Sequence, residues 1–148
     1  MAKIEKINNV EMRLFLSAIF RYQFNLGARI DDSSKKMWKN LKCHPNDAHS
    51  MYSLITKLVW SKNIFEERDP PEQILLGASH NNFCVLVGLA SWLEFWTAQG
   101  HHERTEFLFG LEGIDDPDTI KRRASEALKR ILGEDDTFDD VIASCSLN

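Results

Sequence analysis

A chain of 148 residues with 43% hydrophobic and 27% charged residues is long enough for one globular domain with its own core, and for this composition a folded protein is the default expectation. The formal net charge of −4 argues against a nucleic-acid binder when it is taken alone. The longest apolar run, residues 83–93, is about half as long as a bilayer span requires, so we expect no membrane partner.

The charge and the cysteines give further expectations. Residues 1–68 carry twelve Lys/Arg against seven Asp/Glu, whereas residues 69–148 carry six against fifteen. This asymmetry fits an anionic partner on the N-terminal half, and solvated surface charge explains it equally well. Cys43, Cys84 and Cys145 are widely separated and no secretory leader is recognisable, which favours an intracellular protein, with the nucleus as one candidate compartment. We expect one domain over residues 1–133 and a poorly structured acidic tail over residues 134–148.

The first element is a predicted helix over residues 9–26 that is apolar on most of its circumference and should therefore be central in the fold. Gly27 can close it, and Asp31 or Asp32 can cap the next helix. Arg29 would thus be held at a rigid junction, where its planar guanidinium is suited to phosphate oxygens. The alternative is an ion pair between Arg29 and Asp31 or Asp32, which is common at helix starts.

The middle of the chain predicts a short helix over residues 32–39, a loop over residues 42–47, and two β-strands over residues 53–60 and 73–77. The two strands form a hairpin with a long charged loop. Cys43 and His44 are adjacent, but no second pair gives a zinc-like spacing, so we expect neither a metal nor another cofactor.

The C-terminal part predicts a second buried helix over residues 83–98, capped by Asn81 or Asn82. A short strand or extended segment follows over residues 107–109. An amphipathic helix then begins at Asp116 and Pro117 and ends at Gly133. The sequence therefore predicts an α+β fold, mainly α-helical, with a small antiparallel hairpin or sheet.

This order of elements, with Gly-x-Arg at residues 27–29 leading into a short helix, resembles the first part of the catalytic domain of tyrosine recombinases, or integrases, particularly the transposon-borne eukaryotic type. The resemblance covers roughly residues 10–132. It implies that Arg29 is the first catalytic arginine and that a hairpin lysine acts near the leaving group. Lys62 is the first choice for that lysine and Lys57 the second. The implied DNA-binding residues are Arg29, Lys35, Lys57 and Lys62.

The chain departs from the family after its last predicted helix, where a His-x-x-Arg motif and a nucleophilic tyrosine would be expected and neither occurs. The literal His-x-x-Arg at residues 101–104 precedes that helix. Tyr22 lies inside the first helix and Tyr52 lies at the hairpin. Because strand transfer needs a nucleophile in line with the phosphate, we expect a truncated or degenerate recombinase-like domain. Such a domain would hold DNA weakly through its phosphates and would not be an active recombination or integration enzyme by itself.

Two other functions remain open. The first is a helical protein-interaction domain without a nucleic-acid role, which predicts an exposed apolar patch. The second is a metal-dependent nuclease built on Asp31, Asp32 and His44. The recombinase-like hypothesis instead predicts that Arg29, Lys62 and either His44 or His49 converge on one basic concavity.

Overall fold

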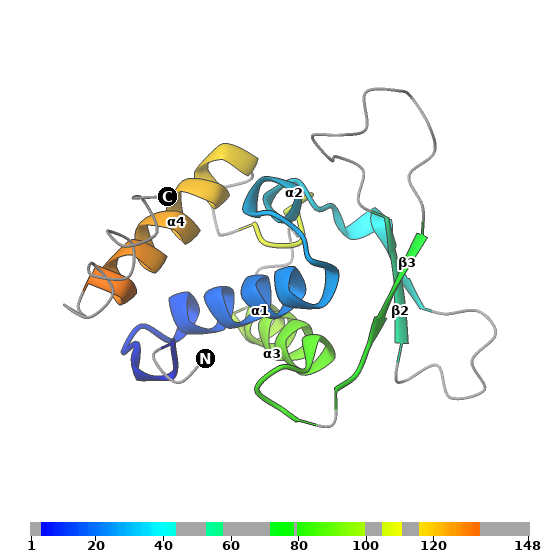
Figure 1. Cartoon of the computed structure of the whole chain (residues 1–148), viewed down its shortest axis with the longest axis horizontal. Coiled ribbons are helices and arrows are strands. Elements are labelled where there is room, and N and C mark those ends of the chain that lie inside the picture. The colour runs from blue at the N-terminus through cyan, green and yellow to red at the C-terminus, as the bar shows by residue number, and fades with distance from the viewer. Residues whose placement is uncertain are drawn as a thin grey trace, which may run out of the picture.

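The computed structural model describes residues 4–43, 53–57, 72–78, 80–99, 105–110 and 116–133. In these ranges the chain is α+β, as predicted, and it has four α-helices and a three-stranded antiparallel sheet (Figure 1). The α-helices are α1 (Val10–Leu26), α2 (Ile30–Ser34), α3 (Val85–Ala98) and α4 (Pro117–Gly133), and the strands are β1 (Leu41–Cys43), β2 (Ser53–Lys57) and β3 (Glu72–Leu76). Two short 3-10 helices are η1 (Ile4–Lys6) and η2 (Trp38–Asn40). None of the helices in these ranges has both the length and the apolar character of a membrane span.

Helix α1 begins and ends where the sequence predicts. The Asn9 side chain accepts a hydrogen bond of 2.9 Å from the Met12 N–H, which satisfies one of the free donors of the first turn. Gly27 adopts the left-handed conformation at φ 59°, a region that glycine enters without steric cost, and so closes the helix. Five side chains of α1 are buried: Phe15, Leu16, Ala18, Ile19 and Tyr22. The helix packs mainly on α3 and also meets α2, β3 and η1, which confirms its central position.

Substitution of Asn9 by alanine should therefore lower the free energy of unfolding by about 1 kcal/mol, because the Met12 N–H loses its acceptor. Urea denaturation would measure this change. The neighbouring exposed residue offers a matched control, since Asn8→Ala removes the same amide without touching the cap. Equal denaturation midpoints for the two variants would show that the cap does not stabilise α1.

Helix α3 lies against α1 and begins later than predicted. Cys84 occupies its N-cap, so the prediction that Asn81 or Asn82 caps it is wrong. The reason is that residues 81–83 form a turn in which the Phe83 N–H donates to the His80 carbonyl, and the Asn82 carbonyl accepts from Arg21 of α1. The polar residues of this segment thus tie the start of α3 to α1 through their backbone.

The sheet lies beside the helices at one end of the molecule (Figure 1), in the order β1-β2-β3. The predicted loop at residues 42–47 is wrong for its first two residues, because Lys42 and Cys43 belong to β1 and pair with Ile55 and Leu54 of β2. Their β structure depends on a partner strand that local sequence does not reveal. Strands β2 and β3 confirm the predicted hairpin pairing within residues 53–57 and 72–76.

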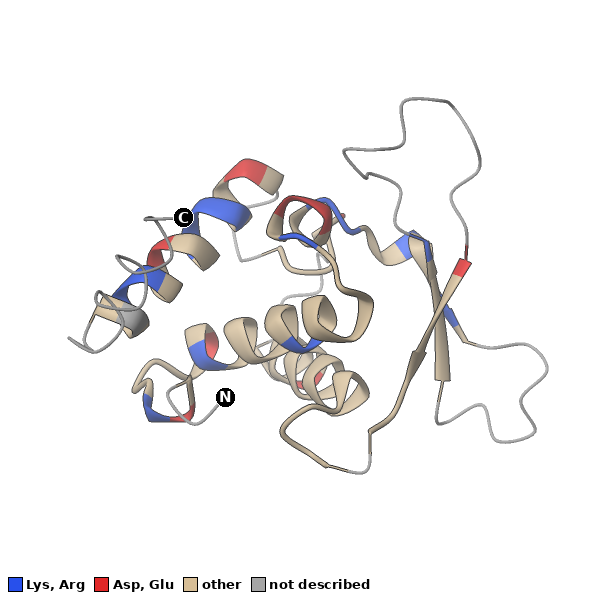
Figure 2. Cartoon of the chain, in the orientation of Figure 1, with Lys and Arg blue, Asp and Glu red and all other residues tan. Residues whose placement is uncertain are grey.

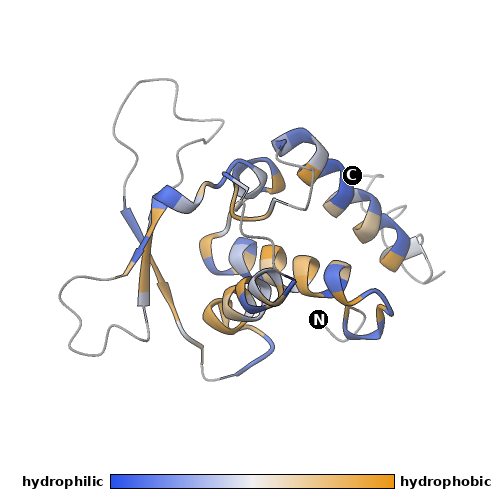
Figure 3. Ribbon diagram, turned by 180° about the vertical axis from the view of Figure 1, so that it is seen from behind, coloured by the Kyte–Doolittle hydropathy of each residue, from blue (hydrophilic) through white to orange (hydrophobic). Residues whose placement is uncertain are grey.

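The last part of the core comes from residues 105–110 and α4. The predicted strand at residues 107–109 is wrong beyond its first residue, since only Phe107 forms an isolated bridge, with Met37, while Leu108 and Phe109 lie in a turn and are buried. Asp116 caps α4 by accepting from the Thr119 N–H at 2.9 Å, as predicted. Helix α4 packs against α2, and in Figure 3 the apolar residues of α4 lie along one side of that helix.

Candidate nucleic-acid interface

Positive charge is concentrated in the basic segment, defined as residues 29–42. This segment holds five Lys/Arg side chains and only two carboxylates. In Figure 2 the Lys and Arg positions, drawn in blue, extend from α2 to the start of the sheet. The net charge of the chain therefore conceals a locally basic surface.

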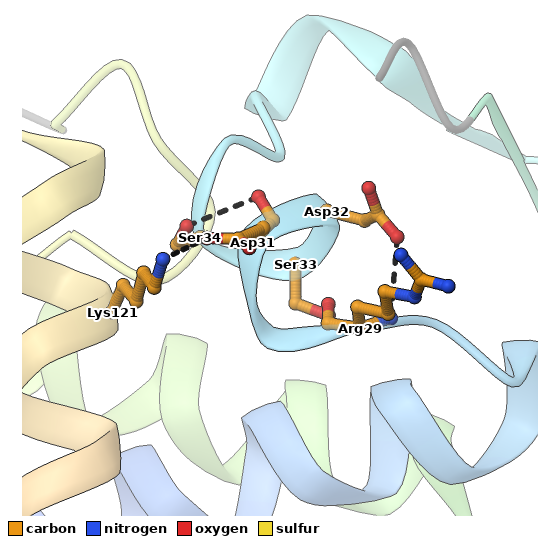
Figure 4. A network of polar contacts seen from close by, with 6 residues as sticks. All are labelled: Arg29, Asp31, Asp32, Ser33, Ser34 and Lys121. Atoms are coloured by element: carbon orange, nitrogen blue, oxygen red, sulfur yellow. Dashed lines mark hydrogen bonds and ion pairs between the residues drawn. The ribbon is translucent and has the colours of Figure 1, made fainter. Parts of the chain in front are cut away.

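Arg29 stands at the N-cap of α2 with its backbone fixed. Its carbonyl accepts from the Asp32 N–H at 3.1 Å, the Ser33 N–H at 3.0 Å and the Ser33 hydroxyl at 3.1 Å, and its own N–H donates to the Asp32 carboxylate at 3.2 Å (Figure 4). The expectation that Asp31 or Asp32 occupies the cap is wrong, because Arg29 itself does and Asp32 reaches back to it. The residue is exposed and its backbone is held by four hydrogen bonds.

The ion-pair alternative predicts that the Arg29 guanidinium pairs with Asp31 or Asp32, and neither ion pair is present between these described residues. Asp31 instead binds Lys121 of α4 at 2.5 Å, and Asp32 hydrogen-bonds the backbone of Arg29. Figure 4 shows Asp31 turned toward Lys121 and Asp32 lying on the Arg29 side of the helix, where its charge offsets part of the arginine's. Among the residues that are described, Arg29 forms no ion pair, so its donors can meet an external anion.

Lys35 and Lys36 follow directly at the other end of α2. Lys35 is its half-buried C-cap. Lys36 is only 2% exposed, and its ammonium donates to the Lys57 carbonyl at the end of β2. Burial lowers the pKa of Lys36 to about 8. The sequence does not predict that Lys36 is buried, since nothing in this polar segment distinguishes it from Lys35.

Lys57 is the hairpin lysine that the structure describes. Its ammonium lies 3.9 Å from the Glu72 carboxylate on the paired strand, and both side chains are partly exposed. The contact from Lys36 to the Lys57 backbone joins the α2 end of the basic segment to this strand end. Lys62, His44 and His49 lie outside the described ranges, so their predicted convergence with Arg29 stays a prediction.

Tyr22 has no access to a phosphate. Its ring is fully buried, and its hydroxyl shares a hydrogen bond of 3.0 Å with the Thr56 hydroxyl of β2. Burial raises the pKa of Tyr22 well above its usual value, which leaves the phenol neutral. Tyr52 and the His-x-x-Arg at residues 101–104 fall in the ranges that the structure does not describe.

The nuclease alternative receives no support from the carboxylates. Asp31 is engaged by Lys121 and Asp32 by the Arg29 backbone, while His44 lies outside the described ranges. Over the described part of the chain, no group of three or more His, Cys, Asp or Glu side chains could hold a metal ion.

The apolar patch that an interaction domain predicts does occur. The Phe24 patch, defined as Phe24, His80 and Phe83, joins the end of α1 to the start of α3, with ring centroids 5.3 Å apart for the two phenylalanines and 5.7 Å apart for His80 and Phe83. Phe24 is 70% exposed and Phe83 is 47% exposed. Leu76 and Val87, close by in the chain, are also exposed. Two exposed phenylalanine rings therefore lie in contact outside the core.

Comparisons of the chain with protein-family models, with curated proteins and with solved structures find no match. The resemblance to tyrosine recombinases accordingly rests on the order of elements and on Gly27, Arg29 and the hairpin lysines alone.

Proposed function

We propose that this chain binds DNA through its phosphates as a degenerate recombinase-like domain, with Arg29, Lys35 and Lys57 as contacts. The observation that carries the proposal is Arg29 itself, an exposed arginine whose backbone is fixed by four hydrogen bonds and whose guanidinium forms no ion pair within the described ranges. A fixed backbone reduces the conformational entropy lost when the guanidinium engages a phosphate in bidentate geometry. The resemblance adds Lys62 as a fourth contact near the leaving group.

The expected binding is weak and sensitive to salt. Only a few cations are involved, and Asp32 and Glu72 lie beside two of them. Phosphate contacts of this kind act through release of counterions and carry no sequence information. The protein should therefore bind unrelated duplexes with similar affinity.

Arg29→Ala tests the proposal. Each lost phosphate contact reduces affinity about eightfold at about 0.1 M salt, which follows from the counterion-release slope of roughly 0.9 per contact. Arg130→Ala is the matched control, because it removes an exposed arginine from the last turn of α4, away from the basic segment. Fluorescence anisotropy with a labelled duplex would measure both. Equal losses for the two variants would show that binding is spread over the surface and not centred on Arg29.

The missing nucleophile gives a second expectation. Incubated with a nicked suicide duplex, the chain should form no covalent protein–DNA adduct, because arginine and lysine can stabilise charge or donate a proton but Tyr22 is buried against Thr56. A denaturing gel would reveal an adduct as a shifted band. A band that disappears in Tyr22→Phe or Tyr52→Phe would refute the reading of this chain as an incomplete recombinase domain.

One observation favours a second candidate function, self-association through the Phe24 patch. Residues 73–93, which contribute His80 and Phe83, contain no Asp, Glu, Lys or Arg. Two copies could therefore face each other there without repulsion between like charges, as a twofold interface requires. Sedimentation at rising protein concentration should then show a dimer that the double variant Phe24→Ser/Phe83→Ser abolishes. A wild-type chain that stays monomeric would exclude this candidate.

A further inference from the structure

A buried lysine connects the two halves of the proposed phosphate-binding surface. The last residue pair between β1 and β2 is Leu41 with Thr56, and Lys57 is the next residue of β2. The Lys36 ammonium reaches the carbonyl of Lys57 at this point. The backbone of Lys36 is fixed as well, since its N–H donates to the Ser33 carbonyl at 3.1 Å and its carbonyl accepts from the Leu108 N–H at 2.7 Å.

Packing alone does not account for a lysine at this position. The side chain is only 2% exposed, and a buried ammonium costs several kcal/mol of solvation unless a good partner compensates it. Within the described ranges Lys36 forms no ion pair with a carboxylate, and its ammonium contacts the backbone carbonyl of Lys57 instead. A methionine would fill a similar volume without the charge.

We infer that Lys36 is a positioning residue: by holding the backbone of Lys57, it places the Lys57 ammonium on the same phosphate-binding surface as Arg29 and Lys35. This inference rests on the proposed function and assigns different roles to two lysines: Lys57 binds phosphate, and Lys36 positions Lys57. Lys36 is buried and contacts no phosphate itself, so its effect on DNA must pass through Lys57. Arg29, at the opposite end of α2 and held by its own hydrogen bonds, should bind independently of Lys36.

A double-mutant cycle tests this coupling, with DNA affinity measured by anisotropy at about 0.1 M salt. Lys57→Gln should weaken binding about eightfold, as expected for one phosphate contact, and Lys36→Met should weaken it by a similar factor. The double variant Lys36→Met/Lys57→Gln should be no weaker than either single variant, whereas Arg29→Ala combined with Lys36→Met should lose about sixtyfold, the product of the two single losses. Circular dichroism at the assay temperature establishes that every variant is folded, so a general loss of structure is not mistaken for coupling.

The outcomes separate the two proposals. If wild-type protein does not bind, or Arg29→Ala has no effect, the proposed function fails. If Arg29→Ala weakens binding but the effects of Lys36→Met and Lys57→Gln multiply, or Lys36→Met has no effect, the positioning role fails while the proposed function stands. If Lys57→Gln has no effect, Lys57 is not a phosphate contact, and the positioning role fails with it. If Lys36→Met does not fold, the same cycle is measured with Lys36→Gln. Lys36→Arg keeps a charged donor, so Lys57→Gln should again weaken DNA binding when it is introduced into the Lys36→Arg protein.

Discussion

Trp92→Ala should lower the free energy of unfolding by about 3–5 kcal/mol, the range observed for large aromatic residues in a closed core. The Trp92 ring is fully buried between α1 and α3 and meets Phe15 edge-on at 6.0 Å and Trp96 edge-on at 5.5 Å. Its indole N–H donates to the Leu108 carbonyl at 3.1 Å, so truncation also leaves a buried acceptor without its donor. The substitution thus removes contacts to two other segments of the core, α1 and residues 105–110, as well as the contact to Trp96 of the same helix.

Urea denaturation followed by circular dichroism would measure the loss. Leu93→Ala is the matched control on the next position of α3, because Leu93 is 36% exposed and should cost no more than about 1 kcal/mol. Equal losses for the two variants would contradict a core centred on the α1–α3 contact.

Stability should rise with pH between about 8 and 10, and Lys36 should be the cause. Burial depresses its pKa from 10.5 to about 8, so the unfolded chain binds this proton more tightly than the folded chain does. Below pH 8 the folded state carries the full cost of the buried charge, and this cost disappears as pH rises from the folded pKa toward 10.5. The full difference corresponds to about 3 kcal/mol.

Tyr22 sets the upper limit of the pH range in which stability rises. Its pKa is raised above the ordinary value of 10.0, so the unfolded tyrosine loses its proton first and stability falls again above pH 10. Urea midpoints at a series of pH values would show the rise and the fall. Lys36→Met should flatten the rise, whereas Lys39→Met, which removes a largely exposed lysine, should keep it. A rise that survives in Lys36→Met would assign it to another group.

The cost of Lys36 bears on its proposed role. At neutral pH a buried charge lowers stability, and loss of the Lys57 carbonyl contact would lower it as well, so the two effects oppose each other in Lys36→Met. A lysine at this position is therefore better explained by what it positions than by what it stabilises.

Local sequence signals predicted the elements that depend on local chemistry. Gly27 closes α1, and Asp116 with Pro117 begins α4, because caps and closing glycines act within a few residues of the helix end. The periodicity of the apolar residues likewise predicted an α+β fold with a small antiparallel sheet.

The features that local sequence could not predict depend on contacts between distant residues. Strand β1 exists through its pairing with β2, and Asp31 meets Lys121, a residue of α4. Lys36 and Lys35 are indistinguishable in the sequence, and only the approach of β2 buries one of them. Whether the Arg29 guanidinium can bind an external anion therefore depends on a tertiary contact, because Lys121 of α4 pairs with Asp31.

The most direct test of the central claim is a salt titration of DNA binding for wild-type protein and Arg29→Ala. The four proposed phosphate contacts predict a slope of about −3.6 in log affinity against log salt, or a loss of about 150-fold between about 50 and 200 mM. Arg29→Ala should make the slope shallower by about 0.9, because one contact is removed. Identical slopes for the two proteins, or no binding by wild-type protein at the lowest salt, would contradict the assignment of Arg29 as a phosphate-binding residue.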